Sequence, residues 1–149
     1  MESAGRGGGP PDASELVAAA SFDGGGTCIA EARRFAADFL EHARTGHDVP
    51  VSDRAMDLTQ LVVSELVTNA HKYAPGPLLM ELRVTDDAVA VTVRDGVRAR
   101  PLARSVDPGR VGQHGLEIVM AVARTFRVDP EPAGKSVTAT VDLADVPAG

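Results

Sequence analysis

The most informative stretch of this 149-residue chain is Ser64-Glu-Leu-Val-Thr-Asn-Ala-His-Lys-Tyr73. Within it, Glu65, Asn69 and Lys72 stand at positions i, i+4 and i+7, so a helix would carry all three on one stripe. Such a stripe is either a solvated face with a Glu–Lys pair or a set of polar side chains aimed into a cleft. In a cleft, a carboxylate, an amide oxygen and an ammonium could together hold a water, a hard cation and a phosphate. Mg²⁺ prefers oxygen ligands of this kind.

The helix that contains this stretch is predicted to begin after a cap at Ser52 or Asp53 and to end at Tyr73, because Pro75 follows. Its apolar residues cover more than half of its circumference, which indicates a largely buried helix. They are Leu58, Leu61, Val62, Val63, Leu66 and Val67.

The rest of the chain is predicted to form strands and two further helices. An apolar segment at 15–22 predicts an edge strand, and Thr27 is suited to cap a helix that runs to about Arg44. Another helix is expected from Gly115 to about Thr125. Alternating apolar residues predict two β-hairpins. Their strands are expected at 78–84 with 89–93 and at 126–128 with 136–143.

This order of elements predicts an α+β two-layer sandwich, in which about three helices cover one face of a mixed, mostly antiparallel sheet. The domain is expected to span residues 15–143, between a flexible Gly/Pro-rich tail at 1–14 and a C-terminal tail at 144–149. Residues 94–113 show no periodicity, and a loop of that length is usually functional or disordered.

The composition, 44% hydrophobic and 24% charged, is that of a globular protein. A net charge of −6 argues against a nucleic-acid surface, although a local phosphate pocket remains compatible with it. The single cysteine, Cys28, excludes a disulfide framework and fits a reducing compartment. The chain has no apolar run of the roughly 20 residues that span a membrane. A cytoplasmic protein without a membrane segment is therefore expected.

Two further motifs are weak by themselves. Asp95-Gly96 follows the predicted strand at 89–93 and is either a plain turn or a carboxylate that accepts an exocyclic amino group such as that of adenine. Gly96 would allow the backbone to approach a ligand closely. The loop Pro108-Gly-Arg-Val-Gly-Gln-His-Gly-Leu116 leads into a helix, where free backbone N–H groups favour a phosphate.

Together, the three motifs resemble the Bergerat-fold ATPases, the gyrase and histidine-kinase superfamily. Glu65-Leu-Val-Thr-Asn-Ala-His-Lys-Tyr73 is similar to the N-box of that family, Asp95-Gly96 to its first glycine box, and Gly112-Gln-His-Gly-Leu116 to its second. The run at 134–139 resembles the last strand of the short bacterial anti-sigma-factor serine kinases common in actinomycetes. The resemblance covers roughly residues 15–143.

The resemblance implies ATP and Mg²⁺ as ligands. It implies that Asn69 binds the Mg²⁺ that bridges the phosphates, and that Glu65 is the general base. Lys72 would lie near the phosphates, and Asp95 would bind the adenine amino group. The other expected contacts to the nucleotide are Gly96, Gly112, His114, Gly115 and Leu116.

The implied function is an anti-sigma factor with serine/threonine protein kinase activity towards an anti-anti-sigma partner. A sigma factor would be the other partner, and a homodimer is a common arrangement in that family. The alternative is a non-catalytic, nucleotide-responsive binding module that sequesters a regulatory partner. Glu65 favours the kinase, because a pure binder needs no base. The first glycine box, Asp95-Gly-Val-Arg-Ala-Arg-Pro101, lacks the second glycine of many relatives, and Gln113-His114 stand between the glycines of the second box. These departures favour the binding module.

Overall fold

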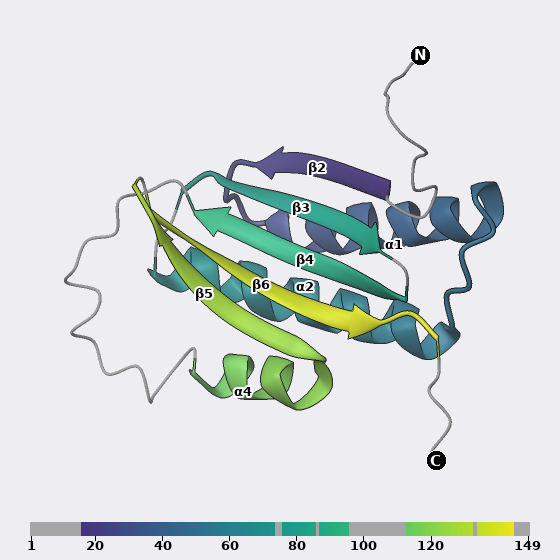
Figure 1. Ribbon diagram of the computed structural model, residues 1–149. Helices are drawn as coiled ribbons and strands as arrows, with labels where there is room; N and C mark the ends of the chain where they lie inside the picture. The colour runs from purple at the N-terminus through teal and green to yellow at the C-terminus, as the bar shows by residue number, and fades with distance from the viewer. Residues whose placement is uncertain (1–15, 74–75, 86, 96–112, 133, 145–149) are drawn as a thin grey trace.

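The computed structural model describes residues 16–73, 76–85, 87–95, 113–132 and 134–144. Five strands and three helices lie within these ranges (Figure 1). They are β2 (Leu16–Phe22), α1 (Cys28–Gly46), α2 (Asp53–Tyr73), β3 (Leu78–Thr85), β4 (Ala88–Asp95), α4 (Gln113–Val122), β5 (Thr125–Glu131) and β6 (Gly134–Asp142).

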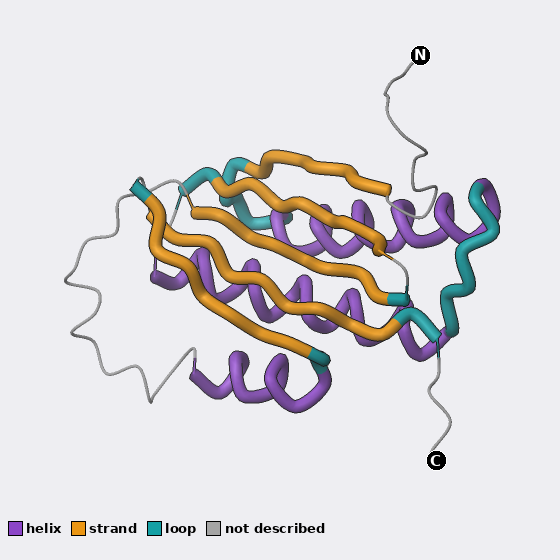
Figure 2. The backbone as a smooth tube through the Cα atoms, viewed as in Figure 1, coloured by secondary structure: helices purple, strands orange, loops and turns teal. Residues whose placement is uncertain are grey.

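The strands form one sheet in the order β2-β3-β4-β6-β5. The helices form a second layer, with α1 against β2 and β3, α2 against β4 and β6, and α4 against β5 and β6 (Figures 1 and 2). This arrangement confirms the predicted α+β two-layer sandwich. Every strand pair in the described part of the chain is antiparallel. The prediction was a mixed, mostly antiparallel sheet, and no parallel pair is found among these strands.

The core lies between the two layers because each inner strand buries alternate residues. In β3 the buried side chains are Leu78, Met80, Leu82 and Val84, and the residues between them are half-buried on the other face. The central helix α2 packs between α1 and α4. Its predicted apolar residues Val62, Val63, Leu66 and Val67 are all buried, which confirms that the helix is largely enclosed.

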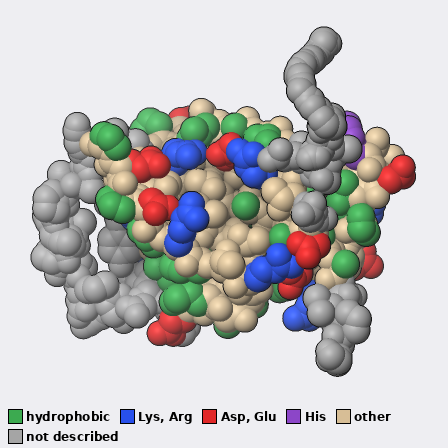
Figure 3. All heavy atoms as spheres, in the orientation of Figure 1, with side chains coloured by type: hydrophobic (Ala, Val, Ile, Leu, Met, Phe, Trp, Pro, Cys, Tyr) green, Lys and Arg blue, Asp and Glu red, His purple; other side chains and the backbone are tan. Residues whose placement is uncertain are grey.

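The opposite face of the sheet is polar and carries no covering helix among the described elements (Figure 2). Threonine hydroxyls pair across it, with 2.9 Å between the Oγ1 atoms of Thr92 and Thr138. Arg94 donates a hydrogen bond to Glu81 at 3.3 Å. Basic and acidic side chains are accordingly interspersed on this face (Figure 3). Such cross-strand pairs let a β-sheet face water without exposing a large apolar patch.

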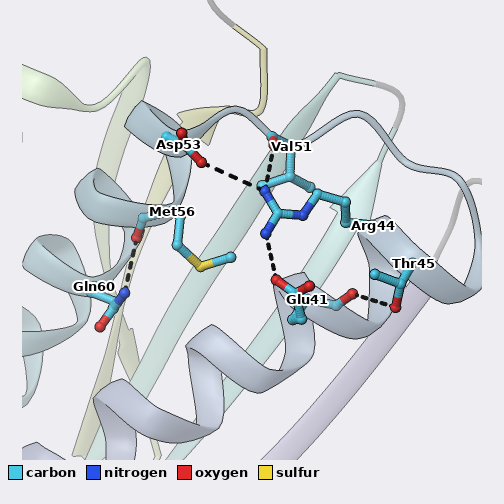
Figure 4. A network of polar contacts seen from close by, with 7 residues as sticks. All are labelled: Glu41, Arg44, Thr45, Val51, Asp53, Met56 and Gln60. Atoms are coloured by element: carbon cyan, nitrogen blue, oxygen red, sulfur yellow. Dashed lines mark hydrogen bonds and ion pairs between the residues drawn. The ribbon is translucent and has the colours of Figure 1, made fainter.

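Most predicted helix boundaries are close to the observed ones. The backbone N–H of Ala55 donates to Ser52 Oγ at 2.9 Å, which makes Ser52 the cap of α2. Arg44 ties the end of α1 to this cap region, because its guanidinium donates to the carbonyl of Val51 at 3.3 Å and lies 3.7 Å from the carboxylate of Asp53 (Figure 4).

The cap of α1 and the boundaries of α4 and β5 differ from the prediction. Thr27 precedes α1 but its hydroxyl makes no capping hydrogen bond to the backbone; it donates instead to the Glu31 carboxylate at 3.0 Å. The last helix, α4, begins at Gln113 and ends at Val122, and β5 already starts at Thr125, where the helix was expected to end. Thr125 is β-branched, and β-branched residues favour a strand over a helix.

Candidate functional site

The predicted site residues meet at one end of the sheet. Asp95 is the last residue of β4 and lies opposite Leu78, the first residue of β3, and opposite Lys135 near the start of β6. Because α2 ends only a few residues before β3, its C-terminal turns lie at this same end, and α4 begins there too (Figure 1). Asp95 was expected to follow the strand. The strand runs two residues further than predicted, so the ladder holds Asp95 on both sides.

Asp95 is a buried carboxylate with one oxygen in use. Asp95 stands two residues after the buried Val93 and four after the buried Val91, so its side chain lies with theirs on the face that the helices cover. Asp95 Oδ2 accepts a hydrogen bond from Lys135 Nζ at 3.1 Å. Asp95 Oδ1 is also buried and has no hydrogen-bond partner among the described residues. Buried carboxylate oxygens are normally satisfied, so Oδ1 is an acceptor suited to a ligand N–H.

Asn69 presents a second orphaned acceptor. The residue is 6% exposed on α2, and its Oδ1 atom is buried without a hydrogen-bond partner within the part of the chain that the structure describes. Leaving a buried polar group unsatisfied costs about 1–3 kcal/mol, and such a cost is usually linked to a role. An amide oxygen is a suitable ligand for Mg²⁺, which takes few protein ligands and completes its shell with phosphate oxygens and water. Asn69 therefore fits the cation that the sequence implies.

The described residues supply no ready-made cluster of acidic side chains for a metal ion. Among the described residues, no group of three or more histidine, cysteine, aspartate or glutamate side chains is placed to hold a metal ion. A cation here would therefore depend on Asn69 together with oxygen atoms from a nucleotide.

Glu65 lies one turn before Asn69 on α2 and packs against α4. A β-carbon built on Gly115 would lie 3.4 Å from the Glu65 Cδ atom and would clash with Oε1. The first turn of α4 therefore brings Gly115 directly against the half-buried Glu65 carboxylate. The structure thus brings together two of the residues that the sequence placed in one site.

The other predicted contacts divide into three groups. Lys72 is exposed in the last turn of α2, and Leu116 is half-buried on α4, where it packs against the core. The backbone of His114 belongs to α4, but its side chain lies outside the described part of the structure. Gly96 and Gly112 lie outside the described residues altogether, as does most of the loop at 94–113. The roles of these residues stay predictions.

Lys135 is the residue of this region that the sequence does not single out. Its strand is recognisable from the run at 134–139, but nothing local to that run shows which residue stands across from it. The partner, Asp95, is 40 residues away along the chain and becomes its neighbour only through the β4–β6 register. The only local signal for a role of Lys135 is its position, since it is a long charged residue near the start of a strand made mainly of small residues and valine.

The two-layer sandwich thus carries two buried acceptors, Asp95 Oδ1 and Asn69 Oδ1, that have no hydrogen-bond partner among the described residues. A family model for the histidine kinase-like ATPase domain matches residues 27–141, and the chain belongs to that family. No curated protein matches the chain significantly. Within the described ranges, no helix combines the length and the apolar character needed to cross a membrane.

Proposed function

We propose that the protein is a cytoplasmic anti-sigma factor with serine/threonine protein kinase activity towards an anti-anti-sigma partner. The observation that carries this proposal is the position of Glu65. Its carboxylate is half-buried, one helical turn from the orphaned amide oxygen of Asn69, and it lies at the first turn of α4. A proton acceptor beside a cation ligand is what activation of a hydroxyl group requires, whereas simple nucleotide binding does not need one.

Each described residue has a distinct role in this proposal. Asp95 Oδ1 accepts a hydrogen bond from the adenine amino group, and Asn69 holds Mg²⁺. Bound Mg²⁺ would neutralise charge on the phosphates. Glu65 accepts the proton of the substrate serine, and Lys72 lies near the phosphates. Phosphoryl transfer depends mainly on positioning and charge neutralisation, so this short set of groups is sufficient.

The second candidate is a non-catalytic binding module that responds to nucleotide and sequesters a regulatory partner. It is favoured by the departure at residues 95–101, where the sequence has a single glycine. In this candidate Asn69 and Asp95 keep their roles. The Glu65 carboxylate then only packs against the first turn of α4 and takes no part in catalysis. The two functions therefore predict the same ligand and differ in what Glu65 does.

Binding is tested first, by calorimetry with ATP and Mg²⁺. The wild-type protein should bind, and Asn69→Ala should weaken binding at least about tenfold, as expected for loss of a cation ligand. Gln60→Ala is the matched control, because this amide lies on the same helix and its side chain donates to the carbonyl of Met56 at 3.5 Å. Equal affinity in Asn69→Ala and in the wild type would refute the assignment.

Catalysis is tested separately with a partner captured from the native cytoplasm. ATP labelled at the γ-phosphate should transfer label to a serine of that partner. Glu65→Gln should abolish transfer while ATP binding persists, and Glu117→Gln, an exposed glutamate on α4, should leave transfer unchanged. Binding of ATP without any transfer to a captured partner supports the binding module instead. The captured protein also shows whether a sigma factor, an anti-anti-sigma protein or a second copy of this chain is bound.

A further inference from the structure

The ion pair between Lys135 and Asp95 goes beyond the residues considered so far. The two side chains face each other across the β4–β6 ladder, with 3.1 Å between Lys135 Nζ and Asp95 Oδ2. Their side chains are 28% and 3% exposed, so the carboxylate is almost fully enclosed and the lysine reaches it from the rim. The lysine therefore determines which carboxylate oxygen a ligand can use.

The pair presents a specific hydrogen-bonding pattern. Of the two Asp95 oxygens, Oδ2 is engaged by Lys135, and Oδ1 has no hydrogen-bond partner among the described residues. An ammonium carries three N–H donors, and Asp95 takes one of them. A ligand that approaches the pair therefore meets one free acceptor beside a cationic donor.

We propose that Lys135 is a nucleobase-specificity residue, which reserves Oδ1 of Asp95 for the adenine amino group and donates to the neighbouring ring nitrogen. The proposal rests on the proposed binding of ATP at Asp95. On its edge, adenine carries one amino donor next to one ring-nitrogen acceptor, which is the complement of a single acceptor beside a donor. Lys135 thereby contacts the nucleotide through its base, in addition to neutralising Asp95.

The same arrangement disfavours guanine. Guanine presents two adjacent donors, its ring N–H and its amino group, and a carboxylate with both oxygens free can accept both at once. Lys135 disfavours that two-pronged contact, because its ammonium already donates to Oδ2 and a guanine N–H aimed at the same oxygen would lie beside that positive donor. A buried donor left without an acceptor is costly, so guanine nucleotides bind less tightly while the ion pair is intact.

Lys135→Met tests this selectivity by measuring the dissociation constants for ATP and GTP. The ratio of the GTP constant to the ATP constant should fall at least about tenfold in the variant, the scale of one charged hydrogen bond. Arg127→Met is the matched control. This variant also removes one positive charge, but Arg127 is exposed on β5 and pairs with Asp129 at 2.8 Å. The ratio of the GTP to the ATP dissociation constant in Arg127→Met should therefore equal that of the wild type. An unchanged ratio in Lys135→Met, with ATP still bound, overturns the proposal.

A second measurement needs no substitution. The chain contains only two lysines, Lys72 and Lys135, so an amine-reactive label read by mass spectrometry reports on these two and the N-terminus. Adenosine, which has no phosphate, should protect Lys135 and leave Lys72 reactive. Labelling of Lys135 that is unaffected by saturating adenosine or ATP overturns the proposal even if Lys135→Met unfolds. If the wild-type protein binds neither ATP nor GTP, the proposed function itself fails, which is a different outcome from bound ATP with an unprotected Lys135.

Discussion

The carboxylate of Glu65 on α2 occupies the space that a β-carbon on Gly115 of α4 would need. Gly115 lies inside the helix α4, so an ordinary helical backbone suffices at this position. The glycine is therefore required for space and not for backbone conformation. It allows α4 to begin directly against the residue that we propose as the general base.

Gly115→Ala should separate this steric role from helix stability. Alanine favours a helix over glycine by up to about 1 kcal/mol, and the clashing atom is the end of a flexible side chain, so the variant should fold. The displaced carboxylate should instead lower the rate of phosphoryl transfer, with a smaller effect on the affinity for ATP. Transfer and binding assays on the same preparation check this expectation.

The coupling between Glu65 and Gly115 can also be measured through stability, without an activity assay. In a Glu65→Ala background the clash is gone, so Gly115→Ala should raise the free energy of unfolding by more than it does in the wild type. Urea denaturation of the two single variants and the double variant gives the interaction energy directly. Strictly additive effects would show that Glu65 does not constrain position 115.

Asn69→Ala should leave the stability of the nucleotide-free protein almost unchanged and reduce its stabilisation by ATP·Mg²⁺. Because Asn69 Oδ1 is buried and unpartnered among the described residues, its removal relieves a desolvated acceptor while it leaves a small cavity. Without nucleotide, we expect the free energy of unfolding to change by no more than about 1 kcal/mol. At ATP·Mg²⁺ concentrations of about 100 times the dissociation constant, the wild type should gain about 2.7 kcal/mol, or roughly 10 °C in melting temperature.

Thermal unfolding with and without ATP·Mg²⁺ provides the readout, and Gln60→Ala again serves as the control. The wild type and the control should both be stabilised by the nucleotide, and the stabilisation of Asn69→Ala should be smaller by at least about 1.3 kcal/mol, which corresponds to tenfold weaker binding. A comparable shift in all three proteins would remove Asn69 from the site. A loss of several kcal/mol in the nucleotide-free variant would instead mean that the amide is a structural group.

The local features of the fold follow from periodicity and capping chemistry, and they were predictable. The burial of Val62 and Val63, the cap at Ser52 and the pairing of the strands at 78–84 and 89–93 are all determined by residues close together in sequence. The long-range register is different. No local signal places Lys135 opposite Asp95, because that pairing depends on how two distant strands align in the folded sheet.

The candidate site divides in the same way. The sequence nominated Glu65 and Asn69 by residue type and spacing, and Asp95 by its place after a strand. The structure adds that one oxygen each of Asn69 and Asp95 has no partner among the described residues. The contact between Glu65 and Gly115 could not be predicted, since it depends on how α4 packs on α2. Residue identity can thus nominate a ligand group, but packing decides whether its polar atoms are available.

The ion pair of Arg124 with Asp87 should make stability depend on pH in the acid range. Arg124 lies between α4 and β5, and its guanidinium contacts Asp87 at 3.2 Å and also Asp142. The hydrogen bond from Arg124, followed by its positive charge, lowers the pKa of Asp87. A carboxyl group whose pKa is lower in the folded state stabilises the protein above its unfolded pKa of about 3.9 and loses this contribution as the pH falls through the folded value.

Asp87→Asn should therefore be less stable than the wild type at pH 7, and the difference should disappear near pH 2. Asp87 is exposed, so the effect should be small and should shrink in high salt. Urea denaturation at the two pH values measures it, with Asp57→Asn, an exposed aspartate on α2, as the control. A difference that persists at pH 2 would mean that the charge of Asp87 is not responsible.

Cys28 should react slowly with thiol reagents even though it is the first residue of α1. A helix N-terminus normally favours the thiolate, but Cys28 is only 3% exposed, and burial raises the pKa of its thiol. The backbone hydrogen bond with Gly24 acts in the opposite direction and is the smaller influence. Burial therefore determines both access to the sulfur and its ionisation. Alkylation with iodoacetamide at pH 8 should be much slower for the folded protein than in guanidinium chloride, and its rate should still be rising above pH 9. Equal rates in the folded and unfolded protein would show that the N-terminus of α1 opens readily and packs only weakly on the core.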